Sequence, residues 1–243
     1  MRAMFSGASS FNQPIGEWDT HNVRDMGSMF SGASSFNQPI GRWDTSNVRN
    51  MCSMFAFSAF DQSIDTVQRK DGYVSWNTCR VCDMSSMFEG AKSFNRPIAN
   101  WKTSKVTSMS RMFKHATSFN QPIGEWDTRR VCNTSSMFGN ALSFNQPLHA
   151  TATSWDTSAI VDMSFMFAYA ACFNHPIASW DTSGVRNMTG MFLYATSFNH
   201  PLETWNVAQV RNLERMFENA RAMKLIPSWR GGCVLIRDYR RVQ

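Results

Sequence analysis

The chain has 243 residues, of which 43% are hydrophobic, enough for one elongated domain. It contains no run of about 18 apolar residues, so the sequence predicts no membrane-spanning helix. The formal net charge of +6 keeps acidic molecules among the candidate partners. The segment Met1 to Phe5 already belongs to a repeated unit and leaves no room for a signal peptide, so we expect none.

The first complete unit runs from Asp25 to Val48, and its first half predicts a short helix. Four apolar residues follow one another at the spacing of one helix face: Met26, Met29, Phe30 and Ala33. Asp25 directly precedes them, where a carboxylate accepts hydrogen bonds from the first turn of a helix. We therefore predict about two helical turns that end near Gly32.

The second half of the unit predicts extended chain with corners. Pro39 has no N–H group to donate to a sheet, which leaves room for only one short strand. Two positions for this strand remain open, residues 36–38 and residues 40–43. The polar stretch from Asp44 to Asn47 has the composition of a turn.

This unit recurs about every 25 residues, and the repeat is the strongest signal in the sequence. Each copy carries one tryptophan, at Trp18, Trp43, Trp76, Trp101, Trp126, Trp155, Trp180, Trp205 and Trp229. The repetition predicts one domain over residues 1–229, which consists of eight full turns and an incomplete turn at each end. Insertions lengthen two copies, near residues 65–75 and 149–154, and residues 230–243 form a basic tail outside the repeat. Because neither end has the polar cap that stacked repeats need, we interpret the chain as a fragment or as carrying a foreign tail.

The expected fold class is an α/β repeat solenoid, a right-handed coil of turns of about 25 residues, each with a short helix and a short parallel strand. One unit alone cannot bury its apolar side chains, so the units must stack, with every indole pointing inward. One slot holds an asparagine in seven copies and Asp61 in the third, and we predict that these side chains bond to neighbouring turns. A threonine slot is interpreted as a turn-stabilising device rather than as an ice-binding face.

Basic residues flank a recurring valine in seven of eight copies. They are Arg24, Arg49, Arg80, Lys105, Arg130, Arg186 and Arg211. In an extended segment the residues before and after the valine point to the same side, so we expect one outward column of cations. Such a column suits an acidic polysaccharide, a nucleic acid or an acidic protein. The favoured alternative pairs these cations with the columns of aspartates and asparagines beside them.

No arrangement of residues points to catalysis or to a metal. The six cysteines are scattered, and Cys79 and Cys82 form a lone C-x-x-C pair, which we interpret as free thiols. His175 and His200 share a slot in adjacent copies, but no third ligand is evident. We find no Ser-His-Asp order, glycine-rich phosphate loop or paired carboxylates. The sequence therefore predicts no enzyme, no cofactor and no metal site.

The repeat resembles that of a known family. The residues that carry the resemblance are Val48, Met51, Ser53, Met54 and Phe55, with Phe36, Asn37, Gln38, Pro39, Ile40, Trp43, Asp44 and Thr45. Together they resemble the repeat of BspA-like leucine-rich-repeat surface proteins, which occurs in mycoplasma and Listeria lipoproteins and in algal and protist proteins. The resemblance covers residues 4–229. It implies a leucine-rich-repeat-like coil whose strands line a concave face, a cell-surface or secreted location, and no transferable catalytic residue.

From the architecture and the resemblance we expect a monomeric, non-enzymatic module that binds a protein or glycan through a repeated face, with surface adhesion as its setting. The alternative is polyanion or nucleic-acid binding through the column of cations. The identity of the partner and the compartment are not fixed by the sequence.

Overall fold

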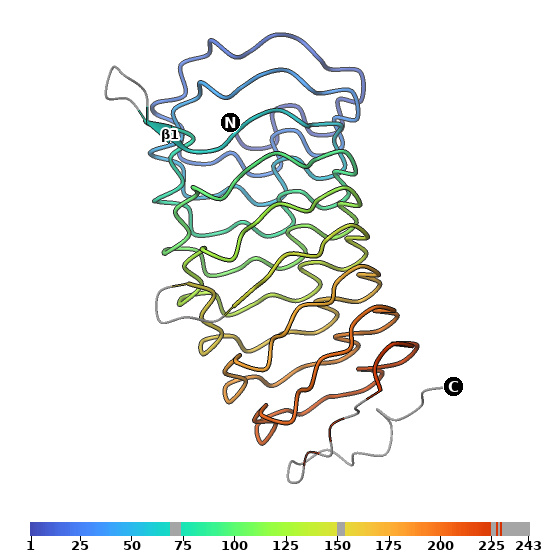
Figure 1. Ribbon diagram of the computed structural model, residues 1–243. Coiled ribbons are helices and arrows are strands. Elements are labelled where there is room, and N and C mark those ends of the chain that lie inside the picture. Colours follow the sequence, from blue (N-terminus) through green and yellow to red (C-terminus); the bar gives the residue numbers. More distant parts are fainter. Residues whose placement is uncertain (69–73, 150–153, 225–226, 228, 230–243) are drawn as a thin grey trace.

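The computed structural model describes residues 1–68, 74–149, 154–224, 227 and 229. Its turns lie one on another in sequence order, from the first turns in blue to the last in red (Figure 1). Seven parallel bridges join equivalent residues of successive turns, namely Asp25, Asn50, Asp83, Ser108, Asn133, Asp162, Asn187 and Asn212. Residues at equivalent positions of the sequence repeat are therefore the ones that pair between successive turns.

The prediction of one helix and one parallel strand in each turn is wrong. The described residues contain no helix, and their only strands are β1 (Val67–Gln68) and β2 (Val74–Ser75), which pair antiparallel. Both strands belong to the insertion near residues 65–75 and not to the repeat. The α/β, leucine-rich-repeat-like fold class is therefore replaced by stacked turns with almost no regular secondary structure.

The backbone after Asp25 explains why no helix forms. Ser28 and Gly32 have φ of 55° and 73°, in the left-handed region that a right-handed helix excludes. Ser28, Phe30 and Gly32 donate their N–H groups to carbonyls of the next turn, while the residues between them donate three positions back along the chain. A helix would direct every N–H four residues back, so this alternation is a series of tight turns.

The spacing of the turns also excludes a helix in each of them. Backbone groups joined by parallel bridges lie about 4.8 Å apart. A helix with its side chains is about 10 Å across, roughly twice that spacing. Successive tight turns place Met26, Met29, Phe30 and Ala33 in the core with the same spacing as a helix face, and all four are fully buried. The apolar periodicity was therefore real, but it did not identify the backbone conformation.

Aromatic rings fill the interior in stacked columns. The ring centroids of Phe30 and Phe36, within one turn, lie 3.9 Å apart, and those of Phe30 and Phe55, in adjacent turns, 5.8 Å apart. The indole of Trp43 donates its N–H to the Ile15 carbonyl of the preceding turn at 3.1 Å. The tryptophans from Trp43 to Trp229 are buried, whereas Trp18, in the first turn, is 38% exposed because no earlier turn covers it.

Two polar columns join the turns at their corners; this was predicted for the asparagines, whereas the threonines were expected to stabilise their own turns. Asn37 Oδ1 accepts the N–H of Asp61 at 2.8 Å, and Asn120 Oδ1 accepts that of Asn145 at 2.9 Å. The threonine column is buried and each hydroxyl donates to a carbonyl of the next turn, as Thr103 does to Asp127 at 3.0 Å. These buried hydroxyls link turns and offer no surface to ice.

Some expectations fall on segments outside the described residues. These are the loop at 69–73, the insertion at 150–153 and the tail at 230–243, which includes Cys233. The other five cysteines are free thiols. Among the described residues no helix is long and apolar enough to span a membrane.

Replacing one buried threonine tests the contribution of this column. Thr103→Val keeps the shape of the side chain but leaves the Asp127 carbonyl without its donor, which should lower the free energy of unfolding by about 1–2 kcal/mol. Urea titration followed by tryptophan fluorescence measures the change. The neighbouring Ser104 is exposed, so Ser104→Ala should change stability by less than about 0.5 kcal/mol. Equal effects of the two substitutions would show that the column does not stabilise the stack.

Candidate functional site

The seven cations singled out in the sequence lie on one repeated segment of the stack, and we call them the cation edge. All seven side chains are exposed. Five successive turns contribute one cation each, from Arg24 to Arg130, and the next turn has Ala159 and Val161 in the corresponding slots. Arg186 and Arg211 follow in the two turns after that interruption. The structure therefore groups the cations as five and two rather than as one unbroken row.

The cation edge has two backbone settings, and this corrects the expectation of one extended segment. Arg24, Arg49, Arg186 and Arg211 follow the valine. The N–H groups of the last three donate to the equivalent carbonyl of the preceding turn, as Arg49 does to Arg24 at 2.9 Å. Arg80, Lys105 and Arg130 precede the valine, in the third position of a four-residue turn. The N–H of Val81 closes one such turn on the Thr78 carbonyl at 2.9 Å. The two groups thus start from different backbone conformations.

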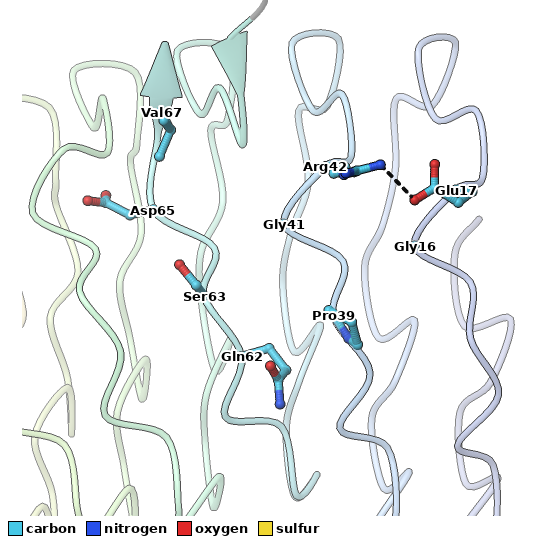
Figure 2. A pocket seen from close by; sticks show the side chains of 9 residues that line it. All are labelled: Gly16, Glu17, Pro39, Gly41, Arg42, Gln62, Ser63, Asp65 and Val67. Carbon is cyan, nitrogen blue, oxygen red and sulfur yellow. Dashed lines mark hydrogen bonds and ion pairs between the residues drawn. The ribbon is translucent and has the colours of Figure 1, made fainter. Parts of the chain in front are cut away.

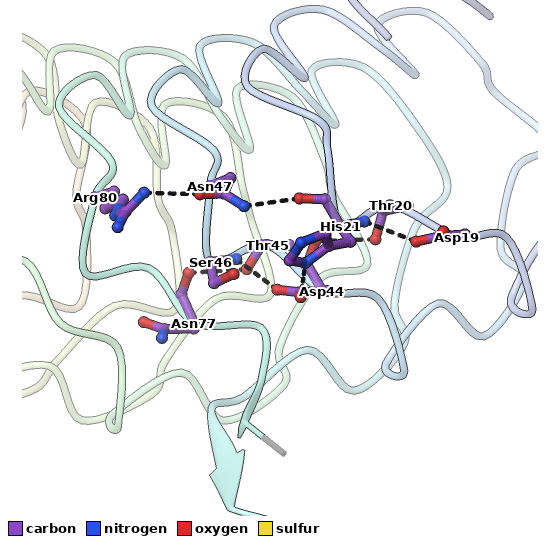
Figure 3. Close-up of polar contacts among 9 residues, drawn as sticks. All are labelled: Asp19, Thr20, His21, Asp44, Thr45, Ser46, Asn47, Asn77 and Arg80. Carbon is purple, nitrogen blue, oxygen red and sulfur yellow. Dashed lines mark hydrogen bonds and ion pairs between the residues drawn. The ribbon is translucent and has the colours of Figure 1, made fainter.

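The cations of this edge do not pair with the aspartates beside them. Within the described part of the chain, none of the seven side chains forms an ion pair with a carboxylate. Arg80 donates to Asn47 Oδ1 at 2.7 Å, and Asn47 Nδ2 donates to the His21 carbonyl at 2.8 Å (Figure 3). The predicted pairing with aspartates is therefore absent from these seven side chains, although Arg80 does bond to an asparagine.

The neighbouring aspartates are held by local bonds. Asp44 Oδ1 accepts the N–H of Ser46 at 2.8 Å, and Oδ2 lies 3.1 Å from His21 Nδ1 (Figure 3). Burial raises the pKa of Asp44, but the hydrogen bonds from Ser46 and His21 outweigh it and hold the pKa below 3.8. The pKa of Asp127 is lowered mainly by its hydrogen bond to the Arg129 side chain, which is not part of the cation edge. The carboxylates thus have partners other than the seven cations.

The pair of His175 and His200 has a structural explanation. Each ring has its Nε2 atom 3.1 Å from a carbonyl of the preceding turn, that of Asn145 or Asn174. Gln121 makes the equivalent bond in its own turn through its amide nitrogen. Histidine therefore replaces glutamine in the same contact. No group of three potential metal ligands lies close together among the described residues.

Two depressions were not anticipated from the sequence. The larger, of about 460 Å³, lies at the corner after the proline, beside β1 (Figure 2). Arg42 pairs with Glu17 at 3.1 Å along it, and Asp65 accepts two hydrogen bonds from Asn100, so these charged groups already have partners within the protein. A side chain at Gly41 would place its Cβ 2.8 Å from the Ser63 carbonyl, which requires glycine there. The insertion near residues 65–75 was the signal that marked this corner.

The second depression, of about 280 Å³, lies in the segment that follows the bridged residues, over Gly139. Asn140 and Tyr169 lie in its wall. Its residues come from three turns, and no local motif in the sequence marks them.

A pair of adjacent arginines can test whether the cation edge is free of internal pairing. Arg129→Gln should raise the pKa of Asp127 towards 3.8 because it removes the hydrogen bond and the charge that lower it. Arg130→Gln, which removes a cation of the edge, should leave that pKa nearly unchanged. Carboxyl chemical shifts followed by NMR through a pH titration give both values. A clear rise in the Arg130 variant would assign Arg130 to internal pairing instead.

Comparison with known proteins places this chain in a family of repeat proteins. The family model described as "Mycoplasma protein of unknown function, DUF285" matches residues 1–74, 65–154 and 148–234. No curated protein and no solved structure matched the sequence. The family match supports a repeat protein but not the narrower resemblance to BspA-like leucine-rich repeats. Because the three matches cover nearly the whole chain, this protein belongs to the DUF285 family of repeat proteins, described as Mycoplasma proteins of unknown function.

Proposed function

We propose that this chain is a non-enzymatic binding module that holds an acidic polysaccharide along its cation edge. The observation that supports the proposal is that seven exposed cations flank the same valine slot of the repeat while none forms an ion pair within the described part of the chain. Unpaired surface cations attract anions, and a regular row of them matches a ligand whose charges also repeat.

The dimensions favour an extended ligand. The five successive turns from Arg24 to Arg130 are separated by four steps of about 4.8 Å, so their cations span roughly 19 Å. A single small anion would meet only one or two of these side chains. A linear polymer lying along the stack would meet all five, and the separate contacts would add to its affinity.

A polysaccharide fits this edge better than a nucleic acid. No aromatic side chain occupies the slots beside the valine, so unpaired bases would find no stacking platform. Aspartates such as Asp25 and Asp83 follow directly in the chain and reduce the local positive potential. Duplex DNA, with one charge per about 1.7 Å, favours a denser basic surface than this. Displayed at a cell surface, a module of this kind would serve adhesion.

Heparin, a sulfated polysaccharide, is a suitable probe for a salt-dependent binding test. The triple variant Arg80→Gln, Lys105→Gln and Arg130→Gln removes three adjacent cations and should weaken heparin binding at least tenfold at 0.1 M salt. Binding of the unaltered protein should decline steeply between 0.05 and 0.3 M salt, because exposed charges are screened (Debye length about 10 Å at 0.1 M).

The matched control removes the same number of exposed charges elsewhere. Lys92→Gln, Arg221→Gln and Lys224→Gln lie outside the slots beside the valine and should retain most of the affinity. Equal losses in the two triple variants would mean that only net charge matters and would refute binding by the edge. Tighter binding to duplex DNA than to heparin at equal salt would also overturn the polysaccharide assignment.

A further inference from the structure

The depression over Gly139 exists because one side chain is missing from a regular surface. Gly139 occupies a slot that Lys114 fills in the preceding turn and Ala168 in the following turn. A Cβ placed on Gly139 would lie 3.3 Å from the Ser136 carbonyl and 3.5 Å from Lys114 Cγ, so the hollow can be filled by substitution with small shifts of its neighbours. Its volume of about 280 Å³ lies at the lower end of small-molecule sites, which suits a single small unit.

One wall of the hollow is aromatic and open to solvent. Tyr169 is 45% exposed, and Tyr194 in the next turn is 36% exposed. Their rings are stacked, with centroids 4.8 Å apart and an angle of 7° between the planes. Both residues have positive φ, 61° and 56°, in a slot that directs side chains away from the core. Phe165 also lines the hollow, but its ring lies over Gly190 in the next turn, so Tyr169 provides the aromatic surface.

The turn of Gly139 and the turn before it line the hollow with polar groups that both donate and accept hydrogen bonds. Asn140 Nδ2 lies 2.8 Å from His115 Nδ1. The Ser136 hydroxyl, the other nitrogen of the His115 ring and the Asn140 carbonyl oxygen have no bonding partner among the described residues. An amide, an imidazole and a hydroxyl together offer donors and acceptors at one place.

The charged group in the lining of the hollow already has a partner. Burial, followed by the charges of Lys114 and Lys92, lowers the pKa of His115 although Glu89 opposes this shift, which favours the uncharged ring. The ammonium group of Lys114 lies 3.4 Å from the Glu89 carboxylate. Among the described residues that line the hollow, the cation of Lys114 is thus already paired, which favours an uncharged ligand.

We propose that this hollow binds one pyranose residue of a neutral glycan. The C–H face of the sugar would lie against the face of the Tyr169 ring that Tyr194 leaves uncovered, and the stacking on Tyr194 would hold that ring in place. Its hydroxyl groups, which both donate and accept, would bond to Asn140, His115 and Ser136. A site that combines apolar contact with a few converging polar groups is typical of small-ligand recognition. A stable protein partner would need about 800 Å² of contact surface, far more than this hollow supplies.

This site is separate from the cation edge in residues and in chemistry. The cation edge lies beside the valine that precedes each bridged residue, whereas the hollow lies on the segment that follows the bridged residue. Either assignment can fail without the other.

The test uses four neutral hexasaccharides, cellohexaose, chitohexaose, maltohexaose and mannohexaose. Saturation-transfer NMR detects binding to the full chain, and calorimetric titration gives Kd for any sugar that binds. At least one sugar should bind with Kd of 1 mM or tighter. Tyr169→Ala and Gly139→Leu should each weaken that binding at least tenfold, the first by removing the stacking surface and the second by filling the hollow. Leucine is compatible with this slot, because Leu193 occupies it two turns later.

Phe57→Ala provides the matched control, because Phe57 is an exposed aromatic residue in the same slot as Tyr169 but four turns earlier. It should change Kd by less than twofold, and far-ultraviolet circular dichroism should show all three variants folded. The proposal is refuted if none of the four sugars transfers saturation, or if binding survives both Tyr169→Ala and Gly139→Leu. Heparin binding measured on the same variants should be unchanged, and a loss there would refute the independence of the two sites.

Discussion

The backbone hydrogen bonds between successive turns are the constraint on which the rest of the structure depends. A parallel bridge joins each turn to the next, first between Asp25 and Asn50 and then between the equivalent residues of every later pair of turns. At that spacing aromatic rings from adjacent turns stack directly, as those of Phe30 and Phe55 do. At the corners, the asparagine and threonine side chains form hydrogen bonds with backbone groups of a neighbouring turn, because the same spacing places those groups at bonding distance. Aromatic stacking and corner bonding are thus consequences of one repeated backbone contact.

The sequence was sufficient to predict which residues are buried but not how the backbone runs between them. The apolar residues and the corner asparagines repeat with the chain, so their slots could be found by counting. The bridged residue also behaves locally as a cap does, since Asp25 Oδ1 accepts the N–H of Gly27 at 2.8 Å. No helix follows Asp25, because the third and seventh residues after it have the left-handed backbone conformation. Residues such as Phe165 and Tyr194 adopt that conformation without any local signal, so only the requirement to bond the next turn explains it.

Of the two candidate sites, one could be identified from the sequence and the other could not. The cation edge could be identified from the sequence because its members flank a repeated valine, although the turn that holds Arg80 and Lys105 makes their setting differ from that of Arg24. Whether the cations pair with carboxylates depended on side-chain positions that spacing does not fix. The hollow over Gly139 could not be predicted, because it combines residues of three turns and depends on the lack of a side chain in one of them.

The left-handed slot that holds Phe57, His115, Asn140 and Tyr169 has a consequence for how such chains diversify. Its side chains point outward and contribute little to the interior, so the slot accepts glycine, amide, imidazole or aromatic groups alike. Unequal recombination that removes or duplicates one 25-residue unit keeps every inward column continuous while bringing new outward neighbours together. A gene built this way can exchange the outward surface of its product in single genetic steps, with the scaffold inherited intact.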